Sequence, residues 1–232
     1  MFFVEKIRNR LTNQSGRIVS LNVGQPRRVQ VETAAGELAV LTAIFKSPVE
    51  GRVAVRGYNL DGDRQADLTV HGGPHKAVYA YASEHYPYWR DLLPGMELPF
   101  GMFGENLTTA GWTEETVQIG DKFRIGTAVL QVSQPRMPCF KLGIRFNRPD
   151  IVKLFWHSGR SGIYFSVVEE GELGAGDAME RIESAKDSVS VADLVRMYRG
   201  DKADPDKLKR VLKLTLPGGW KERIEERLYE KS

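Results

Sequence analysis

Cys139 is the single cysteine of the chain, so any thiol chemistry must take place there. It follows two prolines, Pro135 and Pro138, which stiffen the segment before it. Arg136 and Lys141 flank it and would favour a thiolate if they are near it in space. A thiolate is a nucleophile and a soft metal ligand, whereas a lone cysteine is commonly a small buried hydrophobic residue. From the residues alone, a functional and a structural role are equally supported.

A second candidate is the segment of residues 61–81, which places His71, the pair Gly72 and Gly73, and Lys76 in close succession. Paired glycines let backbone N–H groups approach an anion closely, and a lysine adds a point charge. The simpler interpretation is a tight loop with solvated charges. The local pattern alone favours that simpler interpretation.

Two further patterns are weaker. Residues 103–109, which include Asn106, could bind a ligand, but polar residues between glycines more commonly cap a turn. A zinc site of His71, His75 and Cys139 is conceivable, although their spacing matches no accepted zinc motif. The sequence contains none of the glycine-rich phosphate loops or the nucleophile elbow, which argues against Rossmann, P-loop and α/β-hydrolase enzymes.

The elements that must position these residues are mostly strands. Residues 16–183 contain many short segments in which apolar and polar residues alternate, separated by Gly and Asp-Gly turns. This pattern predicts a β-barrel or closed sheet. The predicted strands are residues 16–24, 28–33, 37–40, 52–55, 122–125, 128–133, 162–168 and 178–182.

Helices are predicted at two places within this region and throughout the C-terminal tail. Residues 83–93 form one helix with Ser83 as its N-cap, and residues 150–158 form another. Residues 184–232 show helical spacing of apolar residues in three short stretches, and Asp204 before a proline is a good helix start. Three short helices bury little alone, so we expect them to pack together or against the barrel.

Composition sets the wider limits. The chain has 232 residues, of which 41% are hydrophobic and 27% charged, as in a folded protein with one large domain and at most a small appendage. A single cysteine excludes an internal disulfide framework and a Cys-rich metal cluster. No stretch is long enough for a membrane helix, and the N-terminus lacks the apolar core of a signal peptide. We therefore expect a cytoplasmic protein.

Charge gives little support for nucleic-acid binding. Residues 184–232 contain 12 Lys/Arg and 9 Asp/Glu, whereas residues 1–183 contain 21 of each. A surplus of three in the tail is thin support for a nucleic-acid or protein-binding module.

Four motifs taken together resemble MOSC-domain proteins, which are named for the C-terminal domain of molybdenum cofactor sulfurase. They are residues 61–67, 70–77, 103–107 and 133–139, and their order and spacing fit that family. The resemblance covers about residues 16–183, and the tail resembles the three-helix extension of the YiiM-like branch. It implies an α+β, mostly β fold, with a β-barrel and inserted helices in residues 1–183 and a three-helix extension in residues 184–232.

The resemblance also implies a role for Cys139, which matches the family's single functional cysteine. In reductase branches this thiolate ligates the molybdenum of a pterin cofactor. In the sulfurase-linked proposal it carries a persulfide. The YiiM-like branch is associated with detoxifying N-hydroxylated bases such as 6-hydroxylaminopurine. The favoured hypothesis is therefore a molybdenum-cofactor oxidoreductase, and the alternative is a sulfur carrier for metal–sulfur cofactor assembly.

Chemistry adds two requirements to the favoured hypothesis. Reductive cleavage of an N–O bond takes two electrons and two protons, which no side chain supplies reversibly, so a redox cofactor must. Nothing in the sequence looks like a flavin or nicotinamide site, so an external electron-donor protein is also expected. Whether the tail binds that donor, closes the pocket or mediates a homodimer stays open.

The cofactor's phosphate needs cationic and backbone donors. The candidates for this contact are Gly72, Gly73, Lys76 and Arg136. Asn106 and Gln134 are candidates for hydrogen bonds to the pterin edge, and His71 is a candidate for orienting a ligand or donating a proton. Asp63 and Arg64 are as readily explained as a structural ion pair that braces the loop.

Overall fold

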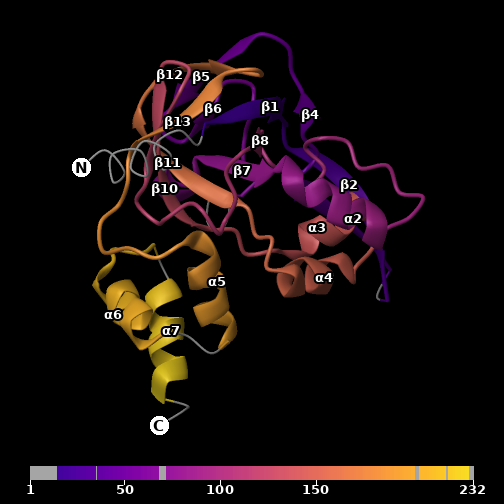
Figure 1. Ribbon diagram of the computed structural model, residues 1–232. Helices are drawn as coiled ribbons and strands as arrows, with labels where there is room; N and C mark the ends of the chain where they lie inside the picture. Colours follow the sequence, from indigo (N-terminus) through magenta and orange to yellow (C-terminus); the bar gives the residue numbers. More distant parts are fainter. Residues whose placement is uncertain (1–14, 35, 68–71, 202–203, 218, 230–232) are drawn as a thin grey trace.

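Seven strands close into a barrel in the computed structural model, which describes residues 15–34, 36–67, 72–201, 204–217 and 219–229 (Figure 1). All pairings in the barrel are antiparallel except that of β7 with β8. The predicted barrel and the mostly β fold are thus confirmed. Around the barrel the strands are β1 (Gly16–Val23), β13 (Ala178–Glu183), β9 (Lys122–Ile125), β10 (Ala128–Pro135), β11 (Ile163–Glu169), β7 (Val78–Ala82) and β8 (Leu107–Ala110).

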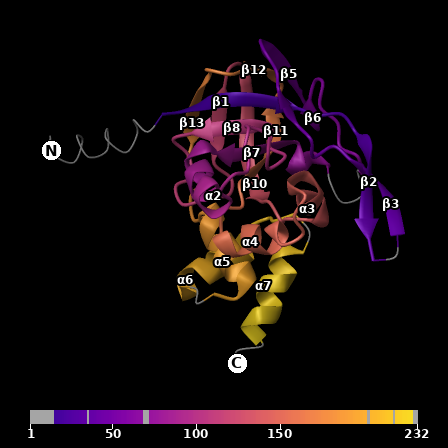
Figure 2. The same cartoon turned by 90° about the vertical axis from the view of Figure 1, so that its right-hand side faces the viewer.

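Smaller sheets decorate the barrel. The hairpin of β2 (Arg27–Thr33) and β3 (Gly36–Thr42) projects to one side of it in Figure 2. A three-stranded sheet consists of β12, β5 and β6. The short strand β4 pairs with the C-terminal end of β1. Their bounds are Gly171–Gly174 for β12, Arg52–Arg56 for β5, Asn59–Leu60 for β6 and Ser47–Pro48 for β4.

The inserted helices gather on one side of the barrel (Figures 1 and 2). They include two single turns of 3₁₀-helix, η1 (Pro74–Lys76) and η2 (Ser83–His85), the second of which leads into α2 (Tyr86–Leu92). The others are α3 (Phe140–Phe146) and α4 (Ile151–Ser158). The predicted N-cap at Ser83 is wrong, because the Ser83 side chain makes no capping hydrogen bond and instead donates to Glu84.

The tail folds into α5 (Val191–Arg199), α6 (Pro205–Lys213) and α7 (Trp220–Tyr229), which pack on one another below the barrel. Asp204 accepts a hydrogen bond from the Asp206 N–H at the start of α6, as predicted for a helix cap. Apolar side chains of the tail share one hydrophobic cluster with the barrel interior. The tail helices therefore pack both together and against the barrel.

The sequence pattern predicts five of the seven barrel strands and misses β7 and β8, because their burial hides the usual alternation. In β7 the five residues Val-Tyr-Ala-Tyr-Ala are all buried, so no polar residue alternates with the apolar ones. In β8 three of four residues are buried although two are threonines, whereas the polar pattern of residues 103–109 indicates a turn. These two strands form the parallel pair of the barrel, and they bring Tyr79 of β7 close to Asn106, which directly precedes β8.

No helix in the described ranges is both long and apolar enough to cross a bilayer.

Candidate functional site

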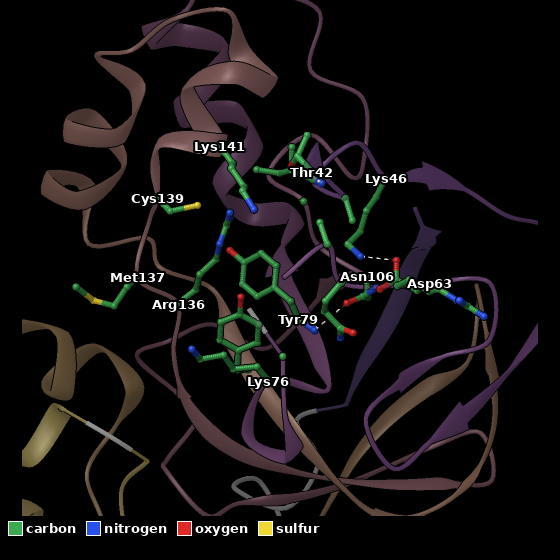
Figure 3. Close-up of a pocket in the computed structure, with 18 residues that line it drawn as sticks. Thr42, Lys46, Asp63, Lys76, Tyr79, Asn106, Arg136, Met137, Cys139 and Lys141 are labelled. Atoms are coloured by element: carbon green, nitrogen blue, oxygen red, sulfur yellow. Dashed lines mark hydrogen bonds and ion pairs between the residues drawn. The ribbon is translucent and has the colours of Figure 1, made fainter. Parts of the chain in front are cut away.

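A pocket lies where the base of the β2–β3 hairpin, the loop before β7, the residues before β8 and the segment between β10 and α3 come together (Figure 3). It collects residues from positions 42 to 164 of the chain. Five of the predicted site residues line it, namely Gly72, Lys76, Asn106, Arg136 and Cys139. Gly73 and Gln134 do not line it, and His71 lies outside the described residues.

Cys139 lines the pocket and is the residue that immediately precedes α3. Its backbone is extended (φ −128°, ψ 168°) and its side chain does not cap the helix. The sulfur points toward the centre of the pocket in Figure 3, near Lys141 and Arg136. The thiol is half-buried, so a ligand in the pocket can reach it.

Arg136 is buried in the pocket wall beside the thiol. Its Nη1 donates to the carbonyl of Phe103 at 2.5 Å, and its guanidinium lies over the ring of Tyr79 at 4.8 Å. Burial works to lower the pKa of Arg136, but Tyr79, Tyr164 and Cys139 outweigh it and the pKa is raised. The guanidinium therefore stays charged, and its charge favours the thiolate of Cys139.

Two tyrosines, Tyr79 and Tyr164, line the pocket together with Arg136. The rings of Tyr79 and Tyr164 lie 5.0 Å apart, and the Tyr79 hydroxyl donates to the carbonyl of Ser161 at 2.9 Å. Burial raises the pKa of both phenols, although Arg136 works in the opposite direction. Both side chains are therefore neutral hydroxyls at physiological pH.

A charged network forms the wall opposite Cys139 in Figure 3. Lys46 Nζ donates to Asp63 Oδ1 at 2.5 Å, and the same oxygen accepts from the N–H of Gly24 at 2.8 Å. Asn106 Nδ2 donates to Asp63 Oδ2 at 3.0 Å. Burial lowers the pKa of Lys46, and Asp63 opposes that shift. The predicted Asp63–Arg64 ion pair is wrong, because Asp63 pairs with Lys46 instead.

The side-chain amide of Asn106 is fully used within the protein. Its Oδ1 accepts from the N–H of Tyr79 at 3.1 Å, and its Nδ2 donates to Asn22 O and to Asp63. Asn106 thus fixes the start of β8 against β7 and holds Asp63 in place. A contact from this amide to a ligand would have to replace one of these bonds.

Gln134 is held away from the pocket by the tail. Its Oε1 accepts from the indole N–H of Trp220 at 2.8 Å, and its Nε2 donates to the carbonyl of His75 at 3.5 Å. Ser133 Oγ donates to the same carbonyl at 2.6 Å. These bonds fasten the turn next to Lys76 to β10 and, through Trp220, to α7.

The loop before β7 reaches the pocket through Gly72 and Lys76. Gly73 has a φ of 83°, which favours glycine, and its carbonyl accepts from the N–H of Lys76 at 3.0 Å. A Cβ at Gly73 would meet no atom within 4 Å, so this turn is open. In the part of the chain that is described, no group of three or more His, Cys, Asp or Glu side chains could hold a metal ion, so no zinc cluster is seen there.

Cationic side chains dominate the described pocket lining, which contains five of them and one carboxylate. This excess, together with one soft sulfur, suits a ligand that carries both an anionic group and a thiophilic metal. Lys46 and Tyr164 had no signal in the sequence, because their partners are distant in the chain. The cations are Lys46, Arg64, Lys76, Arg136 and Lys141, and the carboxylate is Asp63.

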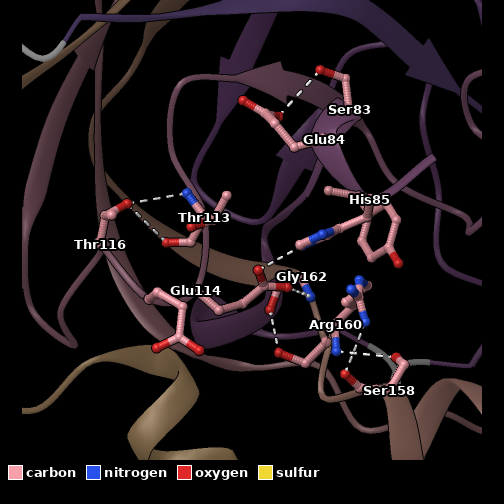
Figure 4. Close-up of polar contacts among 12 residues, drawn as sticks. Ser83, Glu84, His85, Thr113, Glu114, Thr116, Ser158, Arg160 and Gly162 are labelled. Carbon is pink, nitrogen blue, oxygen red and sulfur yellow. Dashed lines mark hydrogen bonds and ion pairs between the residues drawn. The ribbon is translucent and has the colours of Figure 1, made fainter. Parts of the chain in front are cut away.

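A second buried acid–base pair lies outside this pocket, where the barrel meets the tail (Figure 4). His85 Nε2 and Glu114 Oε2 are 2.7 Å apart, and Glu114 Oε1 accepts from the N–H of Gly162 at 2.6 Å. The backbone carbonyl of Glu114 accepts from the N–H of Ala192 at the start of α5. This pair ties three segments together.

The chain is similar to several known proteins. Residues 67–180 match the family model described as MOSC domain. The chain is 41% identical over 195 residues to the uncharacterized protein YflK of Bacillus subtilis, which covers 84% of this chain and 86% of that protein. It is 35% identical over 191 residues to a protein named reductase in Gibberella moniliformis, covering 81% of this chain and 33% of that longer protein.

Among solved structures, the crystal structure of YiiM from Geobacillus stearothermophilus is similar, with a TM-score of 0.72 and 34% sequence identity. The match covers 92% of this chain and 99% of that one, so it includes the tail as well as the barrel.

Proposed function

The chain belongs to the MOSC domain family, and on that premise we propose that it is a molybdenum-cofactor oxidoreductase that reduces N-hydroxylated nucleobases. The observation that carries the proposal is the position of Cys139 beside the buried Arg136 in a pocket rich in cations. The similarity to a protein named reductase supports the redox activity.

The residues present fit such a cofactor. Cys139 offers a half-buried sulfur as the metal ligand. Lys76, Arg64 and the backbone at Gly72 offer cationic and N–H groups to the phosphate of the pterin. The side-chain amide of Asn106, by contrast, forms hydrogen bonds with Asp63 and Tyr79. That of Gln134 forms hydrogen bonds with His75 and Trp220, so both amides support the pocket wall. Hydrogen bonds to the edge of the pterin are then made by other groups.

The reaction is R–NHOH plus two electrons and two protons, which gives R–NH₂ and water. When bound, the cofactor supplies the two electrons, and we propose that an external electron-donor protein replaces them. The protein's own residues bind the substrate, hold the thiolate and provide protons.

Two groups are suited to move a proton. Lys46 Nζ faces the pocket, and burial lowers its pKa, so it gives up a proton more easily than an exposed lysine does. Asp63 accepts its hydrogen bond and holds the amine in place. His71 remains a predicted second donor.

Metal and pterin analysis tests this proposal directly. The wild-type protein, purified from a host that synthesises the cofactor, is compared with Cys139→Ala and with Leu38→Ser, an exposed hairpin variant that should behave as wild type. We expect near-stoichiometric molybdenum in the wild type and in the control, and none in Cys139→Ala. With a chemical reductant, the loaded protein should convert 6-hydroxylaminopurine to adenine.

Two results would contradict the proposal. The first is a loaded protein that leaves 6-hydroxylaminopurine unchanged. The second is the absence of molybdenum from the wild type together with a sulfur adduct on Cys139 after incubation with a cysteine desulfurase, seen by intact mass. That second result would favour the sulfur carrier.

A further inference from the structure

Two arginines flank one aromatic ring beside the pocket. The guanidinium carbons of Arg27 and Arg145 lie 3.6 Å and 5.0 Å from the centre of the Phe45 ring. Neither arginine forms an ion pair with a carboxylate among the described residues. The Nε of Arg145 is buried and has no hydrogen-bond partner there. We call Arg27, Phe45 and Arg145 the arginine rim.

Two residues of the rim, Phe45 and Arg27, are next to residues that line the pocket. Phe45 lies between Ile44 and Lys46, which both line the pocket. In the hairpin register Arg27 pairs with Thr42, another lining residue. The rim therefore continues the pocket wall toward the hairpin.

The helix α3 connects the rim to the thiol. Arg145 lies one helical turn beyond Lys141, which lines the pocket, so both side chains are on the same face. Cys139 directly precedes α3, and the six residues to Arg145 correspond to about 9 Å along a helix axis. A purine nucleotide spans a comparable length between its exocyclic amine and its 5′ phosphate.

Without a bound ligand, the arginine rim reduces the stability of the folded protein. Burial lowers the pKa of Arg145, and the charge of Arg27 lowers it further. A buried N–H without a partner also costs free energy that a bound anion would recover. The adjacent cavity is about 100 Å³, smaller than the roughly 300–1,000 Å³ of a typical small-molecule site, so a bound molecule must extend beyond it, and the rim is next to its wall.

We propose that the arginine rim binds the phosphate of the substrate, and that the substrate is an N-hydroxylated nucleotide rather than a free base. This inference rests on the proposed function and specifies its substrate class. The phosphate of the cofactor is the other source of the same chemistry. We assign that phosphate to the loop of Gly72 and Lys76, because Lys76 lies away from Lys141 in Figure 3.

Ligand binding tests the rim without relying on catalysis. The probes are adenosine 5′-monophosphate, which carries the amine that the reaction produces, and adenosine, titrated calorimetrically into the molybdenum-loaded protein. The wild type should bind the monophosphate at least tenfold more tightly than adenosine. Arg145→Gln and Arg27→Gln should each remove most of that difference and leave adenosine binding unchanged, while Arg145→Lys should restore part of it.

Arg28→Gln is the matched control, because Arg28 is the next residue of β2 and points to the opposite face of the strand. It should leave both affinities unchanged. Equal affinities of the wild type for the two probes would overturn the inference, and so would an equal loss in Arg28→Gln. Loss of molybdenum and pterin from the rim variants would also overturn it, since the rim would then hold the cofactor.

Turnover separates this inference from the proposed function. The loaded protein is assayed with 6-hydroxylaminopurine and with its ribonucleoside 5′-monophosphate. A higher kcat/KM for the nucleotide, lost in Arg145→Gln, supports the inference. Equal kcat/KM values overturn the inference and leave the reductase intact. Reduction of neither compound, with rim-dependent binding of the monophosphate, overturns the reductase and leaves the nucleotide site.

Discussion

The protein buries two acid–base pairs with similar geometry and different surroundings. Lys46 and Asp63 are 2.5 Å apart in the pocket wall, and His85 and Glu114 are 2.7 Å apart at the junction of barrel and tail. Glu114 also receives the backbone N–H of Gly162, so it joins segments of the chain. Around Lys46 and Asp63 the described pocket lining holds an excess of cations beside a thiol.

The difference shows that a buried ion pair by itself identifies neither a functional nor a structural site. Buried pairs are weak evidence for stability, because desolvation offsets much of the attraction. What distinguishes these two is the chemistry of the cavity that each pair lines. Lys46 and Asp63 line the pocket that contains Cys139 and an excess of cations, whereas His85 and Glu114 line a separate cavity of about 340 Å³ whose described lining holds both carboxylates and arginines and no cysteine. Removing each acid should therefore have different consequences.

Asp63→Ala should have the largest effect. The substitution removes the partner of a buried amine and also the acceptor of the Gly24 N–H and of Asn106, so we expect a loss of about 3–5 kcal/mol in the free energy of unfolding. The pocket wall loses its shape as well, so the purified protein should contain little molybdenum. Denaturant unfolding and metal analysis measure the two effects. Asp63→Asn, which keeps an acceptor for Gly24, should lose the cofactor with a smaller loss of stability.

Glu114→Ala should affect stability alone. It leaves the buried N–H of Gly162 without an acceptor, which costs about 1–3 kcal/mol, and it removes the partner of the His85 ring. The molybdenum content of the folded fraction should equal that of the wild type. A variant that unfolds normally but is empty of cofactor would contradict the assignment of this pair to structure.

A pH series should separate the two pairs without mutation. Burial works to raise the pKa of Glu114, but the hydrogen bond and charge of His85 outweigh it, so the pKa is lowered. Its contribution to stability is present above its ordinary pKa of about 4.3 and is lost as the pH falls through the lowered value. Acid should therefore weaken the junction of barrel and tail.

Alkali should act on the pocket instead. The pKa of Lys46 is lowered by burial, so this amine loses its charge below its ordinary value of 10.5, and the affinity of the pocket for anions falls there. Between the lowered pKa and 10.5, Lys46 is protonated to a greater extent in the unfolded chain than in the folded protein. The contribution of Lys46 to the free energy of unfolding therefore increases with pH in this range. The buried tyrosines Tyr79 and Tyr164 have raised pKa values, so their contribution is lost only above about pH 10. Phosphate binding that weakens while the fold persists would confirm this, and simultaneous loss of both would contradict it.

The sequence allowed prediction of those parts of the site that are local in the chain. Cys139, Arg136 and Lys76 belong to short motifs, and all three line the pocket. Lys46 and Tyr164 could not be predicted, because their roles depend on contacts with residues distant in sequence. β7 was missed because a fully buried strand lacks polar alternation. Gln134 was expected to face a ligand, but Trp220, 86 residues away, takes up its oxygen.

The hydrogen bond between Gln134 and Trp220 connects the tail to the loop beside the pocket, so it allows a test of whether the tail affects the pocket as well as the barrel. Trp220→Phe keeps an aromatic ring against Tyr198 but removes the N–H that Gln134 Oε1 accepts. The buried acceptor should cost about 1–3 kcal/mol of stability. Gln134 and Ser133 both hold the carbonyl of His75, so the turn that carries Lys76 should become less protected when Gln134 is released.

Hydrogen exchange across residues 72–77, followed by mass spectrometry, measures that smallest effect. We expect faster exchange of these amides in Trp220→Phe and a decrease of twofold to fivefold in phosphate affinity. Tyr198→Phe is the matched control, because it keeps the ring that packs on Trp220 and leaves the bond to Gln134 intact. If exchange in this turn is the same in Trp220→Phe and Tyr198→Phe, the tail stabilises the barrel without reaching the pocket. If only Trp220→Phe accelerates it, the tail acts on the loop that carries Lys76 through a single buried hydrogen bond.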